Sequence, residues 1–398
     1  MTDHSDKASK EYLDHSKELG LDPNAMNRLI KTIEKDTAQG LYDGAVFIVA
    51  RHGTIAMHEA IGHTDLENKR IARKDDVFHL MSATKQLTTV IILAAIDRGD
   101  FALTTPVREI IPEFGTKGKQ NITVKHLLTH TSGLNTELPF TLPRGGFTNI
   151  QETVKAVSDE RLFYLPGKMV SYNALTAHSI LAEMVCRLDA ANRPFRQILA
   201  EDLFKPLGMK DTSLSLRLDL SDRIVPTVTR YTTPGLFNPS MVKAMSKLLT
   251  EEAEFAAGGA IGTASDLFRF TEMLRRGGEL DGTRILSPQI IKTALTNQTG
   301  SLPNHIFDYS REMRGWPEWP AFIGLSFFLR GEGIFPTSIG ITTSPGTFSG
   351  QGAGSTLFWV DPERDLTFIC LTAGLLEDGD NILRFQRLSD MVVATVVD

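Results

Sequence analysis

The chain has 398 residues, of which 41% are hydrophobic and 23% charged, values ordinary for a soluble globular protein with roughly two or three domains or one elaborate one. Its formal net charge of −6 argues against nucleic acid or an anionic membrane surface as the main partner. The longest apolar run, residues 90–96, is too short to span a membrane, and the polar N-terminus has no apolar stretch behind it. We therefore expect a cytoplasmic protein that binds neither nucleic acid nor membrane, which makes a cell-wall substrate less favoured.

Cys186 and Cys370 lie in apolar segments, which favours buried thiols over a disulfide.

In chain order, the first strong pattern is a pair of apolar runs, residues 45–50 and 55–60, joined by a polar turn, which predicts a β-hairpin. A strongly apolar helix follows from residue 82 and ends at Arg98-Gly99, with a basic last turn and a glycine cap. The next stretch is rich in proline, glycine and helix signals, with few alternating strand patterns.

The C-terminal part again combines helices with strands. The predicted elements are a helix from a capping box at 263–266 to Gly277-Gly278, strands at 355–360 and 366–371, and a final helix with apolar residues three apart at 382–391. Strands at both ends of the chain predict an α/β (α+β) fold, in which a sheet flanked by helices is assembled from both termini around an inserted, mostly helical subdomain. The predicted organisation is an N-terminal extension at 1–25, a sheet domain at 26–100 and 250–398, and a helical subdomain at 101–249.

The most informative motif is Ser82-Ala83-Thr84-Lys85, at the start of the apolar helix. Residues three apart share a helix face, so the Ser82 hydroxyl and the Lys85 amine can meet. Burial and the positive end of the helix dipole both favour a neutral amine, the form that can take a proton from serine. The competing interpretation is that Ser82 is an ordinary helix cap. The same spacing recurs at Ser240-Met241-Val242-Lys243, which we interpret as a simple helix start.

Metal and phosphate sites are not predicted. His58 and His63 are five residues apart, whereas a zinc-binding helix needs histidines four apart, and their segment reads as a strand. The glycine-rich residues 350–356 carry no lysine and run into a strand rather than a helix, unlike a phosphate-binding loop. We therefore expect no metal and no cofactor.

Several segments together resemble one family. They are residues 78–86, 123–134, 166–172, 207–212, 258–267 and 358–362. Their order and spacing resemble the serine β-lactamase and penicillin-binding-protein superfamily, with a pattern closest to its family VIII carboxylesterase and acyltransferase members. The resemblance implies a β-lactamase/transpeptidase-like fold, with an antiparallel sheet and an active site between its sheet domain and helical subdomain. It also implies that Ser82 is the nucleophile, Lys85 its base and Tyr172 a proton shuttle, whose phenol we expect to be partly ionised between cations.

Two departures from the superfamily pattern bear on the substrate. Lactamases and penicillin-binding proteins usually place asparagine two residues after the tyrosine, where this chain has Ala174, with Asn173 one position early. Their Lys-Thr-Gly motif is replaced by Gly350-Gln351-Gly352, so the cation that would hold a substrate carboxylate is missing. By the same correspondence, residues 350–352 would bind substrate, and the amides of Ser82 and Ala353 would form the oxyanion hole.

The prediction is a serine hydrolase that cleaves a small-molecule carboxylic ester through an acyl-serine intermediate. The alternatives are acyl transfer to a small-molecule alcohol, a less favoured D-amino acid amidase, peptidase or β-lactamase activity, and last a non-enzymatic scaffold. The oligomeric state stays open. Residues 302–320 are a candidate loop over the cleft, and His126 and His130 are interpreted as packing and hydrogen-bonding residues. The aromatic residues that could line a substrate pocket, each more often a core residue, are Phe140, Phe147, Phe163, Trp316, Trp319, Phe327 and Phe328.

Overall fold

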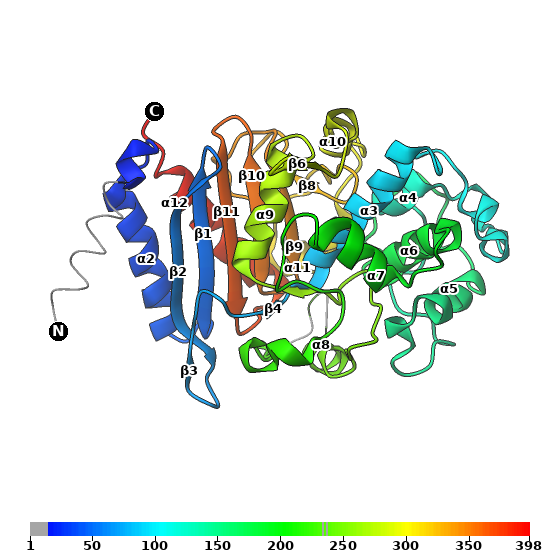
Figure 1. The fold of residues 1–398 in the computed structure, drawn as a ribbon, viewed down its shortest axis with the longest axis horizontal. Coiled ribbons are helices and arrows are strands. Elements are labelled where there is room, and N and C mark those ends of the chain that lie inside the picture. Colours follow the sequence, from blue (N-terminus) through cyan, green and yellow to red (C-terminus); the bar gives the residue numbers. More distant parts are fainter. Residues whose placement is uncertain (1–14, 233–234, 236–237) are drawn as a thin grey trace.

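A seven-stranded antiparallel sheet forms the centre of the computed structural model, which describes residues 15–232, 235 and 238–398 (Figure 1). Its strand order is β3-β2-β1-β11-β10-β9-β8. The strands are β1 (Gly44–Arg51), β2 (Thr54–Asp65), β3 (Arg70–Ile71), β8 (Phe328–Leu329), β9 (Phe348–Gly352), β10 (Thr356–Asp361) and β11 (Leu366–Ala373). The N-terminal strand β1 pairs directly with the C-terminal strand β11, from Gly44 opposite Ala373 to Arg51 opposite Leu366. The sheet is therefore assembled from both ends of the chain, as predicted.

Two short two-stranded ladders lie outside the main sheet. One joins β4 (Phe78–His79) to β5 (Ile261–Gly262), and the other joins β6 (Glu279–Leu280) to β7 (Thr283–Arg284). The first ladder is important for the site, because it fixes the chain immediately before Ser82 to a segment far away in the sequence.

The central strands are continuously apolar because helices cover both faces of the sheet. In β1, Val46 and Ile48 face one core, while Phe47 and Val49 face the other. Successive side chains of a strand point to opposite faces, so a strand that is buried on both faces needs an unbroken apolar run. This requirement explains why the run at 45–50 was readable from the sequence.

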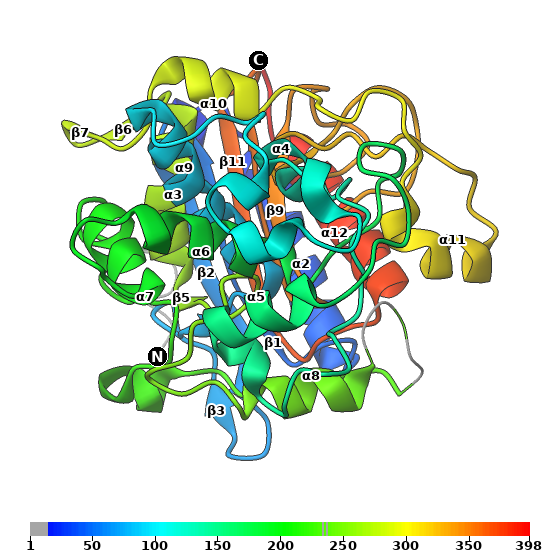
Figure 2. The same cartoon turned by 90° about the vertical axis from the view of Figure 1, so that its right-hand side faces the viewer.

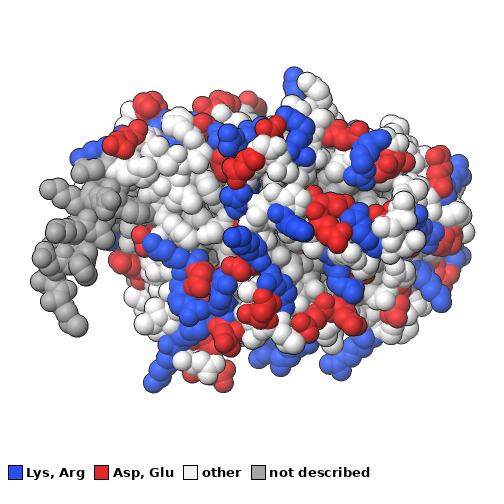
Figure 3. All heavy atoms as spheres, viewed as in Figure 1, with Lys and Arg blue, Asp and Glu red and all other residues white. Residues whose placement is uncertain are grey.

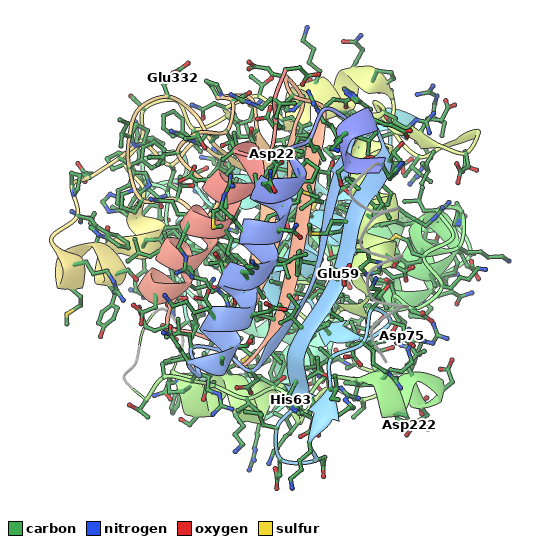
Figure 4. The ribbon with its side chains drawn as sticks, turned by 90° about the vertical axis from the view of Figure 1, so that its left-hand side faces the viewer. Asp22, Glu59, His63, Asp75, Asp222 and Glu332 are labelled. Atoms are coloured by element: carbon green, nitrogen blue, oxygen red, sulfur yellow. The ribbon has the colours of Figure 1, made fainter. Side chains whose placement is uncertain are left out.

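The helices form a thin layer on one face of the sheet and a thick layer on the other. Figure 4 shows α2 (Pro23–Ala38) and α12 (Asp378–Val393) side by side across the first face. On the opposite face, α3 (Thr84–Arg98) and α9 (Ala264–Arg275) pack in the larger core. The remaining helices are α4 (Val124–Leu128), α5 (Ile150–Ser158), α6 (Ala177–Leu188), α7 (Phe195–Leu199), α8 (Pro239–Ser246), α10 (Pro288–Ala294) and α11 (Asp308–Arg314). Figure 2 shows α4 to α7 gathered in front of the sheet, so that α3 lies between the sheet and these helices.

Most predicted elements are confirmed. The hairpin is β1–β2, the strands at 355–360 and 366–371 are β10 and β11, and Gly99 ends α3 in the left-handed conformation. Ser240 lies in the first turn of α8 behind an Asn238 cap, the ordinary helix start that was predicted. Cys370 is a buried and Cys186 a half-buried free thiol. The domain boundaries stay a prediction, and residues 1–14 of the expected extension lie outside the described residues.

Charges of both signs are interspersed over the face shown in Figure 3, in keeping with the small net charge.

Glu59 and His63 lie along β2 (Figure 4), so the segment with the metal-like spacing is a strand, as expected. Within residues 15–232, 235 and 238–398, each helix is too short or too polar to cross a membrane.

Candidate active site

Ser82 lies in a tight turn between β4 and α3. Residues Met81–Ala83 form a single 3-10 turn, and Met81 adopts a left-handed backbone conformation with φ 49°. Such a conformation is costly for a residue with a side chain and persists only where its surroundings hold it. Here the amide of Leu80 donates to Ala260 O at 2.8 Å, and its carbonyl accepts from Thr356 Oγ1 at 3.1 Å. Hydrogen bonds of both the amide and the carbonyl of Leu80 therefore hold the turn that contains Ser82.

Lys85 points back at Ser82 from the first turn of α3. Its side chain is 1% exposed, and Nζ lies 3.2 Å from Ser82 Oγ. Nζ also donates to the carbonyls of Ala174 and Ala257, each at 2.7 Å. A neutral amine has two N–H groups and one lone pair. When the two carbonyls take both N–H groups, the lone pair is left to accept the Ser82 hydroxyl proton.

Burial lowers the pKa of Lys85 from 10.5 to about 7. The predicted neutral amine is therefore well populated near neutral pH, and desolvation is the physical cause. Nearby threonines fasten α3 to the segment that supplies one of the two carbonyls. Thr88 Oγ1 donates to Ala256 O at 2.8 Å, and Thr84 Oγ1 accepts from the amide of Ala260 at 3.0 Å.

Tyr172 lies beside Ser82 and hydrogen-bonds its side chain. Lys85 Nζ is 5.1 Å from the centroid of the Tyr172 ring, and the imidazole of His130 packs edge-on against that ring at 4.6 Å. The amide of Ser171 donates to His130 O at 2.9 Å, so the chain before Tyr172 is tied to the block at 123–134. The packing role expected for His130 is confirmed, and His126 forms a reciprocal cap with Thr123 at the start of α4.

The expectation of a partly ionised phenol is wrong for this site. Burial raises the pKa of Tyr172 well above its usual value, and the nearby cation, Lys85, is itself largely neutral. The phenol is therefore protonated at neutral pH and can donate a hydrogen bond to Ser82 Oγ. Desolvation therefore makes Lys85 the candidate base and Tyr172 a candidate proton donor.

The two residues after Tyr172 have structural roles. Asn173 Oδ1 accepts from the amide of Ala177 at 2.7 Å and from Thr176, so its side chain caps the start of α6. Ala174 supplies a carbonyl to Lys85 and turns its methyl group toward a pocket beside Ser82. At this position the side-chain amide of the lactamase asparagine is therefore replaced by the apolar side chain of Ala174.

Strand β9 passes immediately beside the nucleophile turn. A Cβ at position 352 would collide with Thr356 Oγ1 and lie 2.5 Å from Leu80 O, so this close approach requires glycine. The β8–β9 register covers only Phe348 and Ser349, so residues 350–352 are not paired by β8. Gln351, Gly352 and Ala353 line a pocket with Ser82, and their substrate-binding and oxyanion roles stay predictions. Gly350 is a correction: it packs against Gln86 and Phe358 and does not line the pockets beside Ser82.

Two pockets share Ser82 and Ala353 in their lining. We call the first the α8 pocket. Its apolar wall consists of Phe147, Ala174, Leu175, Val242, Met245, Leu249, Phe255 and Ala257. We call the second the α12 pocket. Besides Gln351 and Gly352 of β9, it is lined by Tyr172, Ile306, Phe307, Phe328, Gly354, Asp378, Asn381 and Ile382.

Some of the aromatic residues that could line a substrate pocket do line one, and the others lie in the core or nearer the surface. Phe147 lines the α8 pocket and Phe328 the α12 pocket, and Trp319 lines an adjoining pocket behind it. Phe327 is a core residue, whereas Phe140 and Phe163 are exposed and Trp316 is half-buried. The segment 302–320 contributes Ile306 and Phe307 to the α12 pocket, but it contains α11 rather than a plain loop.

Replacing Tyr172 with phenylalanine is expected to lower kcat/KM for an ester by roughly 10²- to 10⁴-fold, the usual contribution of a positioned proton donor. The phenylalanine ring keeps the packing against His130, so the thermal unfolding temperature should change little. Steady-state kinetics and a melting curve on the same preparation check this. Near-normal turnover by the folded variant would remove Tyr172 from the chemistry.

The pH profile of kcat/KM should rise to a plateau with a midpoint near 7. Below that pH Lys85 is protonated and cannot accept the Ser82 proton, whereas above it the amine is neutral. Burial lowers the pKa of His130 to about 3 and that of His79 to about 4, so both imidazoles stay neutral through this range. Initial rates with an uncharged ester between pH 5 and 9 test this, and a flat profile would contradict it.

Comparison with known proteins identifies the family of the chain. The family model described as Beta-lactamase matches residues 29–390. The chain belongs to the beta-lactamase family. Among its relatives is Esterase EstB of Burkholderia gladioli, which is 33% identical over 184 residues, covering 42% of this chain and 46% of EstB.

Solved structures of the beta-lactamase family share the fold. One is titled as a family VIII carboxylesterase, with a TM-score of 0.74 and 19% identity, covering 92% of this chain and 97% of that chain. Another is EstCE1, described as a hydrolase with promiscuous acyltransferase activity, with a TM-score of 0.73 and 19% identity, covering 92% and 98%. The resemblance inferred from the motifs is thus confirmed, as is the β-lactamase/transpeptidase fold.

Pocket-lining residues that sequence reasoning missed come from α8, from the segment just after it and from α12. Val242, Met245 and Leu249 form one wall of the α8 pocket, and Asp378 and Ile382 form part of the α12 pocket. The apolar residues among them were visible in the sequence, but apolar character does not distinguish a pocket wall from a core face, and no sequence signal pointed to Asp378.

Proposed function

We propose that this beta-lactamase family member is a carboxylesterase that acts through an acyl-serine intermediate. The observation that carries the proposal is the buried amine of Lys85, which has two backbone carbonyls as partners and lies 3.2 Å from Ser82 Oγ. Esterase EstB and the structurally similar family VIII carboxylesterase support the ester as the substrate class. The proposed partner is a small-molecule ester, and a cytoplasmic location remains a proposal from the sequence.

In the first half of the reaction, Lys85 Nζ takes the Ser82 proton as Oγ bonds to the ester carbonyl carbon. The amides of Ser82 and Ala353 would hold the oxyanion, and each such donor contributes about 3–4 kcal/mol to transition-state stabilisation in comparable enzymes. The bond to the alcohol oxygen then breaks. Tyr172 gives its proton to that oxygen, and the proton held by Lys85 restores the phenol. In the second half, water adds to the acyl carbon and its proton goes to Lys85. The bond between the acyl carbon and Ser82 Oγ then breaks, Lys85 returns the proton to Oγ, and the acid is released.

The lining of the α12 pocket supports the lower rank that we give to lactams and D-alanyl peptides as substrates. Asp378 is the charged side chain among the described residues that line it, and its field raises the pKa of Tyr172. Arg384 of the same helix donates to Thr372 Oγ1 and packs over the Tyr42 ring, so its charge is engaged inside the protein. A substrate carboxylate placed in this pocket would meet a like charge and no lysine.

The test is a comparison of purified enzyme on an aryl butyrate, a D-alanyl amide and a cephalosporin. The proposal predicts that the ester has the highest kcat/KM and that mass spectrometry detects a butyryl adduct on Ser82. Faster turnover of the amide or the lactam would contradict it. Absence of both turnover and Ser82 labelling by a fluorophosphonate would favour a non-enzymatic scaffold.

Acyl transfer is the second candidate function, because EstCE1, which shares the fold, is described as having this side activity. The chemistry is the same up to the acyl-serine, and an alcohol then replaces water as the second nucleophile. Adding a panel of alcohols to the butyrate assay distinguishes the two. Ester products in excess of free butyrate would identify a transferase.

A further inference from the structure

The two pockets beside Ser82 differ in which catalytic group they contain. Tyr172 lines the α12 pocket and does not line the α8 pocket, whereas Ser82 and Ala353 line both. An ester bound to Ser82 has its alcohol on one side of the carbonyl carbon and its acyl chain on the other. The position of Tyr172, the proposed proton donor, therefore distinguishes the alcohol side of the ester from its acyl side.

We propose that the acyl chain of the substrate occupies the α8 pocket, that the leaving alcohol occupies the α12 pocket, and that Val242 limits the length of the acyl chain. This assignment rests on the proposed ester chemistry. Tyr172 must reach the departing oxygen, so the alcohol lies on its side. The tetrahedral arrangement at the reacting carbon then directs the acyl chain away from Tyr172, toward α8.

The wall of the α8 pocket fits an uncharged, apolar chain. Phe147, Leu175 and Phe255 supply apolar surface opposite α8, and Phe147 and Phe255 pack edge-to-face with ring centroids 5.0 Å apart. The methyl group of Ala174 extends this wall at the position where lactamases carry an amide. Charged side chains are absent from its described lining, so a charged acyl group would be desolvated without a partner.

Val242 and Met245 line the pocket from α8. Val242 is 7% exposed, and Met245 follows it three residues later, the spacing that places two side chains on one face of α8, whereas Leu249 comes from the segment just after the helix. Ala244 lies between Val242 and Met245 in sequence but is exposed. The same helix therefore offers a variant within the pocket and a matched variant outside it.

The experiment measures kcat/KM for p-nitrophenyl esters from acetate to decanoate. In the wild type, each methylene that enters the pocket should raise kcat/KM by about fourfold until the pocket is full. Val242→Phe should move this limit to a shorter chain, and the loss should grow with chain length to roughly tenfold or more. Met245→Ala should move the limit to a longer chain, and Ala244→Phe should match the wild type.

A second series keeps the butyryl group and varies the alcohol. Phe307→Ala, in the α12 pocket, should change the preference among alcohols and leave the acyl-length profile as it was. Equal labelling of Ser82 by a small fluorophosphonate in every variant shows that the folded site is intact.

The assignment is overturned if Val242→Phe and Met245→Ala leave the acyl-length profile unchanged, or if they alter the alcohol series instead. Those results leave the proposed function standing, because the wild type still hydrolyses esters. A wild type that hydrolyses no ester overturns the proposed function itself, and the assignment with it.

Discussion

Replacing Ser82 with alanine is expected to lower kcat/KM for ester hydrolysis roughly a millionfold, the scale seen when a serine nucleophile is removed. The alanine variant has no oxygen to form the acyl bond, while the turn stays fixed by Leu80, Ala260 and Thr356. The variant should therefore fold normally and fail to gain the mass of a fluorophosphonate adduct. Intact-protein mass spectrometry and steady-state kinetics measure the two effects.

The chain provides a matched control for this experiment. Ser240 has the same spacing to a lysine as Ser82, but it lies in the first turn of α8 and hydrogen-bonds Asn238. Ser240→Ala should keep wild-type turnover and full labelling. Substantial hydrolysis by Ser82→Ala, or a loss of labelling in Ser240→Ala, would overturn the choice between the two motifs.

Replacing Lys85 with methionine is expected to cost roughly 10²- to 10⁴-fold in kcat/KM, the usual contribution of a general base. Methionine fills the buried site but has no lone pair on nitrogen to accept the Ser82 proton. Lys85→Arg is the sharper variant. Arginine keeps N–H donors for the carbonyls of Ala174 and Ala257, but it stays protonated at any working pH and cannot act as a base.

Both variants should be nearly inactive, although Lys85→Arg keeps N–H donors and adds a permanent positive charge. If Lys85→Arg hydrolysed esters at a rate near the wild type, the role of Lys85 would be electrostatic support rather than proton transfer. Lys243→Met is the control, because Lys243 holds the equivalent position in the second motif and its side chain is exposed. Kinetics with one aryl ester, together with melting curves, separate loss of chemistry from loss of folding.

The sequence was most informative where one physical requirement dominates. Strands β1, β10 and β11 must be apolar on both faces, so their runs were readable without the structure. The pairing of Ser82 with Lys85 followed from helix geometry, and the low pKa of Lys85 from the apolar character of the helix. Tyr172 could be located only through the family resemblance, because its position depends on backbone hydrogen bonds to residues near 130.

The remaining features depend on contacts between segments far apart in the sequence. Gly350 and Gly352 look equivalent in the sequence, yet one packs under α3 and the other beside the nucleophile turn. Val242 and Asp378 come from helices that read as ordinary surface helices, and only the folded chain brings them to Ser82. The ionisation of Tyr172 was misjudged because the degree of its burial outweighs the effect of nearby cations, and that burial is not visible in the sequence.

The most direct test of the central claim is an NMR titration of Lys85 in the resting enzyme. Carbon-13 label at the lysine ε position gives one signal for each lysine, and the Lys85→Met variant identifies the signal of Lys85 by its loss. Burial of the amine predicts a titration midpoint near pH 7. A Lys85 signal that stays in its protonated position until about pH 10, as for an ordinary lysine, would contradict the account.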